Sequence, residues 1–203
     1  MKTLGITGGV GTGKSTVSKL LHELYGIKVI DADKLSREAT DSKEVLDKIV
    51  KTFGQQYVKD GKLDRAAMGK LIFGNEKMRE KLNGIIHPVV QKNYYLLRDK
   101  YRSEGEEYII YDCPLLIEAG LIADVDDIIL VYLDKKSAIK RVMQRNNLSE
   151  KDAANMVNAQ MDIDEKTEYA DYIIYNDGDL NDLEEAVREL FAEIKEDHDD
   201  LDE

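Results

Sequence analysis

Residues 3–16 have the sequence TLGITGGVGTGKST, the most informative segment of the chain. Its first part, Thr3–Thr7, is short, partly β-branched and followed at once by glycines, which predicts a strand that ends in a turn. From Lys14 to Tyr25 apolar side chains recur at helical spacing, at Val17, Leu20, Leu21 and Leu24. We therefore expect a strand, a glycine-rich loop and a helix, in that order.

The loop in this segment carries the phosphate-binding pattern G-x-x-x-x-G-K-S, from Gly8 to Ser15, between the predicted strand and helix. Glycines let the backbone turn tightly and direct amide N–H groups at phosphate oxygens, and the helix N-terminus adds roughly half a positive charge. Lys14 is expected to reach the β- and γ-phosphates of ATP, and Ser15 to ligate Mg²⁺. The alternative is a glycine turn with an incidental Lys-Ser pair. The residues expected to contact the nucleotide are Gly9, Gly11, Thr12, Gly13, Lys14, Ser15 and Thr16.

Four further apolar runs have the length of buried strands: Ile27–Ile30, Tyr108–Tyr111, Ile128–Leu133 and Tyr172–Tyr175. Helical patterns follow the later runs, over Lys135–Arg145, Ser149–Met161 and Leu180–Ile194. This alternation predicts an α/β fold with a five-stranded, mainly parallel sheet, helices on both faces, and ligands bound at the carboxyl ends of the strands. The last residues, 196–203, are expected to fray into an acidic tail.

The segment Leu35–Ser103 interrupts this alternation. Its apolar residues have helical spacing, no strand is expected in it, and a helix is expected to begin near Pro88. Between Lys34 and Arg102 there are 16 Lys and Arg against 9 Asp and Glu, which leaves a balance of +7 in a chain of formal net charge −12. This segment could face an anionic ligand, or its lysines could lie on ordinary solvated helix faces.

Composition limits the class of protein. The 203 residues, of which 42% are hydrophobic and 34% charged, suit one α/β domain with an inserted element better than two independent domains. The charge of −12 argues against nucleic acid or an anionic membrane as partner. No apolar run approaches the roughly 20 residues needed to span a bilayer, and MKTLGITGG reaches glycine too soon for a signal peptide. The single cysteine, Cys113, fits a reducing compartment, so we expect a cytoplasmic protein.

Acidic residues follow two of the predicted strands. Asp33 could accept the proton of an acceptor hydroxyl and orient its oxygen toward the γ-phosphorus, whereas Asp31 would point the opposite way on a strand. Both acids could instead cap a helix or stabilise a turn. Asp112 ends the third strand, where P-loop proteins commonly place the acid that holds Mg²⁺ or its water. Pro114 stops that strand, and Leu115-Leu116 followed by Glu118 could form a wall for the acceptor, or the leucines could be ordinary core residues after a turn.

Three basic residues remain as candidates. Arg141 and Arg145 lie four residues apart on a predicted helix, hence on one face, where they could neutralise phosphate charge as part of a lid or simply be solvated. His87 precedes Pro88 and could bond the acceptor, or cap and pack. No tyrosine is assigned to nucleobase stacking.

Taken residue by residue, these features favour a P-loop kinase that moves the γ-phosphoryl group of ATP to a hydroxyl of a small molecule. A GTPase is not favoured, because the chain has no Asn-Lys-x-Asp sequence for guanine. Two alternatives stay open at this point. One is a nucleoside or nucleotide kinase of the same fold, and the other is a regulatory protein that binds ATP without transferring phosphate, for which Asp33 would be dispensable.

Several motifs, in order along the chain, resemble those of the bacterial dephospho-CoA kinase family. They are residues 5–16, Val29–Asp33 with Arg37, His87-Pro88, Asp112–Leu116 with Glu118, Gln160-Met161 with Lys166, Ala170-Asp171 and Asn176–Gly178. Their joint order over most of the chain is far more specific than any single motif.

The resemblance implies a nucleoside-monophosphate-kinase-like core at residues 1–34 and 106–203, with a small lid at about 140–168, and a helical acceptor domain inserted at residues 35–105. It also implies the reaction: transfer of the ATP γ-phosphoryl group to the ribose 3′-hydroxyl of dephospho-CoA, the last step of coenzyme A synthesis. Mg²⁺ is the expected cofactor. A monomer is the expected state, and an oligomer is the alternative.

The resemblance further implies the roles of single residues. The catalytic residues would be Asp33 as base, with Lys14 and Arg141 on the ATP phosphates, and Asn176 would lie near adenine. Mg²⁺ would be held by Ser15 and Asp112. The acceptor would be bound by Asp33, Arg37, His87, Pro114 and Leu115.

Overall fold

The computed structural model describes residues 1–201, and their side chains as far as His198. The chain divides into two compact units. One contains residues 1–29 and the chain from residue 104 onward, and the other contains residues 30–103.

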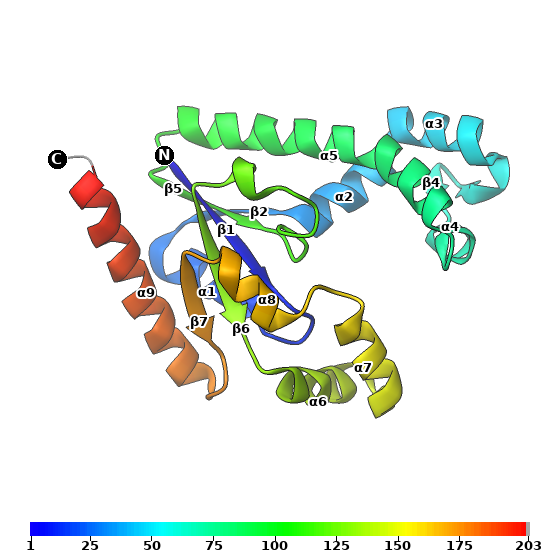
Figure 1. Ribbon diagram of the computed structural model, residues 1–203. Helices are drawn as coiled ribbons and strands as arrows, with labels where there is room; N and C mark the ends of the chain where they lie inside the picture. Colours follow the sequence, from blue (N-terminus) through cyan, green and yellow to red (C-terminus); the bar gives the residue numbers. More distant parts are fainter. Residues whose placement is uncertain (202–203) are drawn as a thin grey trace. The chain divides into compact units, whose positions relative to one another are not determined.

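A five-stranded sheet organises the first unit (Figure 1). Its strands run in the order β2-β5-β1-β6-β7, and the pairings of β1 with β5, β1 with β6 and β6 with β7 are parallel. Lys2 lies opposite Tyr108 and Leu4 opposite Asp127, so β1 is the central strand. The predicted α/β fold is confirmed. The strands are β1 (Lys2–Gly8), β2 (Lys28–Asp31), β5 (Tyr108–Asp112), β6 (Asp127–Tyr132) and β7 (Tyr172–Tyr175).

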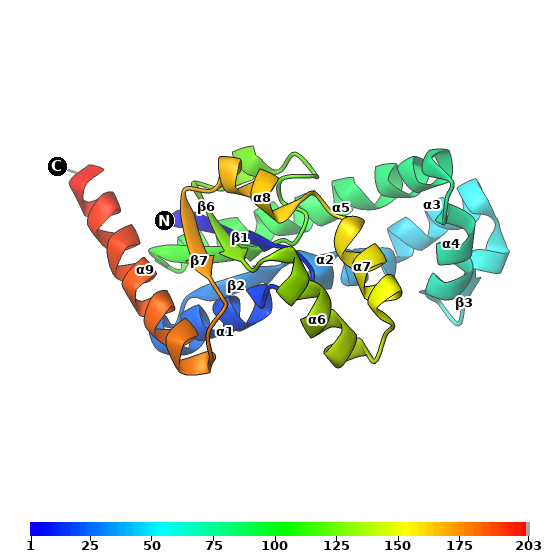
Figure 2. The same cartoon turned by 60° about the horizontal axis from the view of Figure 1, so that its bottom comes forward.

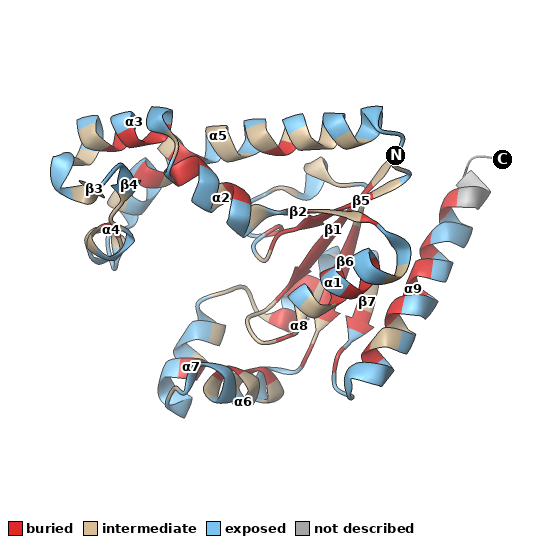
Figure 3. Cartoon of the chain, turned by 180° about the vertical axis from the view of Figure 1, so that it is seen from behind, coloured by how far each residue is buried: buried red, intermediate tan, exposed pale blue. Residues whose placement is uncertain are grey.

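Helices cover both faces of this sheet. Helices α1 (Lys14–Tyr25) and α9 (Leu180–Leu201) pack on one face, and α8 (Ile163–Lys166) lies on the other, as the views from front and back show (Figures 1 and 3). Helices α6 (Lys135–Asn146) and α7 (Glu150–Asn158) follow the carboxyl end of β6 and lie side by side (Figure 2). The single-turn helices η2 and η3 cover Ile122–Asp124 and Thr167–Tyr169.

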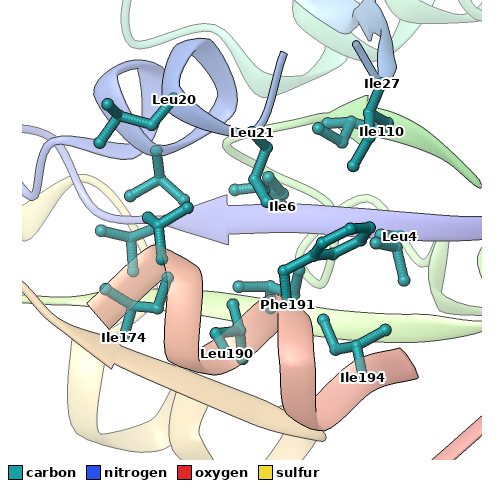
Figure 4. Close-up of a cluster of buried hydrophobic side chains, with 14 of the residues drawn as sticks. Leu4, Ile6, Leu20, Leu21, Ile27, Ile110, Ile174, Leu190, Phe191 and Ile194 are labelled. Carbon is teal, nitrogen blue, oxygen red and sulfur yellow. The ribbon is translucent and has the colours of Figure 1, made fainter. Parts of the chain in front are cut away.

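The core of this unit forms because α1 and α9 turn their apolar stripes toward the sheet. Leu4 and Ile6 of β1 pack with Leu21 of α1 and Phe191 of α9, all nearly excluded from solvent (Figure 4). Complete burial of such a side chain stabilises the fold by about 1.5–3 kcal/mol. The cluster fixes β1, and with it the loop that follows β1.

The carboxyl-terminal helix is longer than the sequence predicted. It continues to Leu201, so the expectation that the chain frays from residue 196 is wrong for residues 196–201. Residues 202–203 lie outside the described part of the chain. Two contacts stabilise these last turns: His198 Nε2 lies 2.8 Å from Asp127 Oδ2, and the Tyr172 hydroxyl donates to Asp197 Oδ2 at 2.6 Å. Burial, followed by the bond to Asp197, raises the pKa of Tyr172.

The second unit is mainly helical and has its own core. Side chains of α3, α4 and α5 form that core, with Val45, Ile49, Met68, Leu82 and Ile86 buried together. Asp31, Ser42 and Asp64 each cap the helix that follows. The elements are α2 (Ala32–Thr40), α3 (Lys43–Phe53), η1 (Gln55–Tyr57), β3 (Val58–Lys59), β4 (Lys62–Leu63), α4 (Arg65–Ile72) and α5 (Glu76–Ser103).

Two expectations for this unit are wrong. A short antiparallel hairpin, β3–β4, lies where no strand was expected, and Asp60 and Gly61, both with positive φ, form its turn. The helix expected to begin near Pro88 instead begins at Glu76 and contains that proline. Buried residues lie on both sides of Pro88, at Ile86 and Tyr94, so packing outweighs the roughly 3 kcal/mol that an internal proline costs.

Candidate active site

The loop between β1 and α1 has the turned backbone that phosphate binding requires. Gly11 and Gly13 have φ of +87° and +92°, and a Cβ at Gly13 would collide with the Asn176 side chain. Thr12 Oγ1 donates to the Gly9 carbonyl at 2.9 Å and tightens the loop. Among the described residues no side chain caps the N-terminus of α1, so that helix end is open to an anionic ligand.

Asn176 and Arg141, both expected at the nucleotide, meet beside this loop. Asn176 directly follows β7 and is buried, and its Nδ2 donates to the Thr12 carbonyl at 2.7 Å. An Arg141 guanidinium N–H donates to the Asn176 carbonyl at 2.8 Å. Arg145 is exposed and bonds the Asn146 side chain instead. Of the two arginines on this helix, Arg141 is therefore the one that reaches the loop.

Helix α6, which carries Arg141, is fixed at its N-terminus by a side-chain cap. The Asp134 carboxylate accepts the Ser137 backbone N–H at 3.0 Å, and hydrogen bonding from Ser137 lowers the pKa of Asp134. Buried Ala138 and Val142 anchor the inner face of the helix. At the end of β6, the Tyr132 hydroxyl donates to Asp164, a bond that raises the pKa of Tyr132.

Lys14 and Asp112 contact each other directly. The Lys14 ammonium bonds Asp112 Oδ1, and Ser18 Oγ donates to Asp112 Oδ2 at 2.6 Å. The register of the sheet explains the meeting, because Asp112 at the end of β5 lies opposite Ile6, two residues before the loop begins. An ammonium and a hydroxyl thus hold the Asp112 carboxylate beside the phosphate-binding loop.

Ser15 and Asp112 supply the hard oxygen ligands that Mg²⁺ prefers. Ser15 is exposed in the first turn of α1. Within the described residues there is no group of three or more His, Cys, Asp or Glu that could hold a metal ion. Mg²⁺ in kinases keeps several waters and takes one or two protein oxygens besides the substrate phosphates. The two residues fit such a site.

The loop after β5 is fastened at Pro114. The Pro114 carbonyl accepts from Thr7 Oγ1 at 3.1 Å and from Lys166 Nζ at 3.0 Å. Beyond it, Leu116 is completely buried, whereas Leu115 remains 46% exposed. Of these two leucines, Leu115 is therefore the one available to a ligand.

Two residues to which sequence reasoning assigned no role, Gln160 and Lys166, also contact this region. Gln160 Oε1 accepts the Val10 backbone N–H at 2.8 Å, and Lys166 Nζ lies 2.9 Å from Glu118 Oε1. The only signal for them in the sequence was their place in the ordered motifs, because neither periodicity nor charge pattern distinguishes them from surface residues.

Asp33, Arg37 and His87 belong to the unit of residues 30–103. Asp33 lies in the first turn of α2, and Arg37 Nε donates to the Asp33 carbonyl at 3.3 Å, so both lie on one side of that helix. Asp31 caps α2 by accepting the Lys34 N–H at 2.9 Å, which is the capping role left open for both acids. Among the described residues, the side chains of Asp33 and His87 have no hydrogen-bond or ion-pair partner, and both are exposed.

A membrane-spanning helix is not found in the described part of the chain, where none combines the necessary length and apolarity.

Comparison with known proteins identifies the family. The family model for dephospho-CoA kinase matches residues 2–182. The dephospho-CoA kinase of Listeria monocytogenes is 42% identical over 188 residues, which cover 92% of this chain and 94% of the relative.

Solved structures agree with this result. The dephospho-CoA kinase from Campylobacter jejuni has a TM-score of 0.73 and 27% identity, with 97% of this chain and 98% of that chain covered. The crystal structure of TT1252 from Thermus thermophilus has a TM-score of 0.81 and 33% identity, with 95% and 97% covered. The resemblance predicted from the motifs is confirmed: the chain belongs to the dephospho-CoA kinase family.

Proposed function

We propose that this protein transfers the γ-phosphoryl group of ATP to the ribose 3′-hydroxyl of dephospho-CoA and so produces coenzyme A. One observation carries the proposal: an open phosphate-binding loop, with Lys14 against Asp112, in a chain that matches the dephospho-CoA kinase family over residues 2–182. In the reaction, the acceptor oxygen forms a bond to the γ-phosphorus, the bond from that phosphorus to the β–γ bridging oxygen breaks, and ADP leaves.

On the donor side, the backbone of residues 9–16 binds the ATP phosphates. Lys14 shares its ammonium between Asp112 and the transferring phosphoryl group, where positive charge stabilises the transition state. Arg141 adds a second cation, and its bond to the Asn176 carbonyl keeps it beside the loop. Asn176 supports Thr12 and lies near the adenine base.

Ser15 and Asp112 would hold Mg²⁺, Asp112 either directly or through a water. When bound, the ion would neutralise negative charge on the ATP phosphates.

On the acceptor side, Asp33 accepts the proton of the 3′-hydroxyl and orients its oxygen. Because the transition state of phosphoryl transfer is loose, orientation contributes more than basicity. Arg37 binds a phosphate of the acceptor, and His87, Pro114 and Leu115 contact the rest of it. The balance of +7 between Lys34 and Arg102 supports an anionic ligand for this part of the chain.

The same proposal includes the arrangement of the working enzyme. Residues of about 140–168 act as a lid over the nucleotide, and residues 35–105 act as the acceptor-binding insertion on a core made of residues 1–34 and 106–203. The enzyme works as a monomer in the cytoplasm, with small molecules rather than nucleic acid or membranes as partners.

A product assay tests the function. The protein is incubated with Mg-ATP and, separately, dephospho-CoA, nucleosides and nucleotides, and the products are weighed by mass spectrometry. We expect dephospho-CoA alone to gain one phosphoryl group, with phosphorus–proton coupling in the NMR spectrum placing it on the 3′-oxygen. Transfer to a nucleoside or nucleotide instead would contradict the proposal, and so would tight ATP binding without any transfer.

A further inference from the structure

Lys166, which the reaction described above does not use, is completely buried. Its ammonium has two partners, Glu118 Oε1 at 2.9 Å and the Pro114 carbonyl at 3.0 Å. A buried charge is costly to desolvate unless it is paired and hydrogen-bonded. The fold has therefore built a specific site around this lysine at the end of α8.

The segment that carries Lys166 is bonded to both loops of the candidate active site. At its start, Gln160 accepts the Val10 N–H of the phosphate-binding loop at 2.8 Å. Its next residue, Met161, donates its N–H to Glu118 at 3.3 Å, and Lys166 then completes the contact to Pro114. Residues 160–166 thus bridge the loop after β1 and the loop after β5.

The Pro114 carbonyl is the point at which these contacts converge. It accepts from Lys166 and also from Thr7 Oγ1, two residues before the phosphate-binding loop. Asp112 comes two residues before this carbonyl and the exposed Leu115 directly after it. Fixing the carbonyl therefore fixes Leu115, the candidate acceptor contact, whereas Asp112 is already held by its bonds to Lys14 and Ser18.

The buried ion pair between Lys166 and Glu118 is better explained by the positioning of neighbouring residues than by a gain in stability. A buried ion pair often stabilises a fold no better than a well-packed apolar pair of similar volume. What the pair supplies, and an apolar pair would not, is directional bonding between Lys166, Glu118 and Pro114.

We propose that Lys166 is a positioning residue for phosphoryl transfer, which holds residues 113–118 in register with the phosphate-binding loop. Its kinetic consequences rest on the function proposed above. Without Lys166, Leu115 would lose its fixed place relative to Lys14, while Asp112 would keep its bonds to Lys14 and Ser18. The contacts that hold the loop itself, from Asn176 and Gln160, would also remain.

The main experiment compares Lys166→Met with a matched control, Lys135→Met. The control removes the ion pair between Lys135 and Asp162, which also reaches this segment but is exposed to solvent. For Lys166→Met we expect kcat/KM for dephospho-CoA to fall about 30-fold or more, since small misplacements in active sites have effects of this size. We expect the equilibrium Kd for ATP to change less than about 3-fold. Loss of overall structure would instead reduce both ATP affinity and kcat/KM for dephospho-CoA. Lys135→Met should behave as the wild type.

Two further variants keep the test valid if Lys166→Met unfolds. The double variant Glu118→Gln, Lys166→Met removes both charges and keeps an acceptor for the Met161 N–H, so it should fold and still show the loss of rate. Lys166→Arg keeps a cation and N–H donors and should recover part of the rate. A folded double variant with kcat/KM within about 3-fold of Lys135→Met would overturn the proposal, and so would equal losses in ATP affinity and acceptor kcat/KM.

Hydrogen–deuterium exchange separates this proposal from the proposed function. In the folded variant, amides of residues 113–118 should exchange at least about 10-fold faster than in the wild type, while those of β5 stay protected. This measurement needs no acceptor. If the wild type fails to phosphorylate dephospho-CoA but the exchange changes as expected, the function is wrong and the positioning stands. Unchanged exchange of residues 113–118 would overturn the positioning whatever the acceptor is.

Discussion

The two units of the chain hold their candidate site residues in opposite ways. In the first unit, Lys14, Asp112 and Asn176 are bonded to one another's segments, and each meets a partner distant in sequence. In the unit of residues 30–103, Asp33 and His87 are exposed and, among the described residues, their side chains have no polar partner. The candidate donor residues are thus held by contacts within the protein, whereas Asp33 and His87, the candidate acceptor residues, are left exposed.

This difference has an energetic meaning. Groups that are already oriented stabilise a transition state without reorganisation at the moment of reaction. Side chains that become ordered on binding each cost about 0.5–1.5 kcal/mol of the interaction free energy. We therefore expect substitutions in the first unit to act on the chemical step, and most substitutions of the exposed residues to act on acceptor binding.

The largest effect is expected for Lys14→Ala. Loss of the ammonium should reduce kcat about 10³-fold, because it removes a preorganised charge from the transferring phosphoryl group. Steady-state kinetics at saturating ATP and dephospho-CoA measure it, with circular dichroism to verify the fold. Lys19→Ala, an exposed lysine of the same helix paired with Glu23, is the control and should retain full activity. Near-normal turnover of folded Lys14→Ala would exclude the phosphate role.

Asp33→Asn is expected to come next, and it is the exception in its unit because the proposed function gives its carboxylate a part in the reaction. The amide keeps the shape but cannot accept a proton, so kcat should fall about 10²-fold with both substrates still bound. Kinetics and equilibrium binding of each substrate check this. Asp31→Asn is a close control, since asparagine also caps helices well and α2 should be unaffected. A normal rate with weakened ATP binding would instead assign Asp33 to the donor site.

Arg37→Ala should mainly weaken acceptor binding. Loss of a charge-assisted bond to phosphate costs about 1.5–3 kcal/mol, or roughly 10- to 150-fold in KM for dephospho-CoA, and KM for ATP should change little. Arg37→Lys should recover only part of the loss, because an ammonium lacks the bidentate fork. Kinetics with each substrate varied in turn decide the matter, and Lys34→Ala on the same helix is the control. A selective rise in KM for ATP would contradict the division of roles between the units.

The smallest effect on activity is expected from core substitutions. They test whether the core of either unit influences the kinetics or only the stability of the fold. Ile49→Val in the second unit and Ile129→Val in the first each truncate a completely buried side chain. Each should lower the free energy of unfolding by about 0.5–1.5 kcal/mol in urea denaturation, and leave kcat and both KM values unchanged. A change in acceptor KM from Ile49→Val alone would mean that the helical core also shapes the acceptor residues.

Much of the fold followed from short-range patterns in the sequence. All five long strands and the helix of residues 14–25 were expected, because buried parallel strands are continuous apolar runs and the glycine-rich motif marks a strand–helix junction. The β3–β4 hairpin was missed because two-residue strands leave almost no periodicity. The start of α5 was misplaced because packing around Ile86 and Tyr94 overrides the local preference of Pro88.

The candidate site was predictable as a set of residues but not as a set of contacts. Gly11, Gly13 and Lys14 could be recognised from one motif. The bond from Asn176 to Thr12 spans 164 residues, and the bond from Lys166 to Pro114 spans 52. Such partners are brought together only by the order of strands in the sheet, which local spacing does not determine.

The strand order also has a consequence for folding of the protein during its synthesis on the ribosome. Strand β1 begins at residue 2, and its two neighbours, β5 and β6, begin only at residues 108 and 127. At about 5–20 residues per second, β1 waits on the order of 5 to 20 s for its first neighbour to be made. During that interval residues 30–103 are completed, and they contain all the partners of their own core. The phosphate-binding loop is therefore translated early and assembled late.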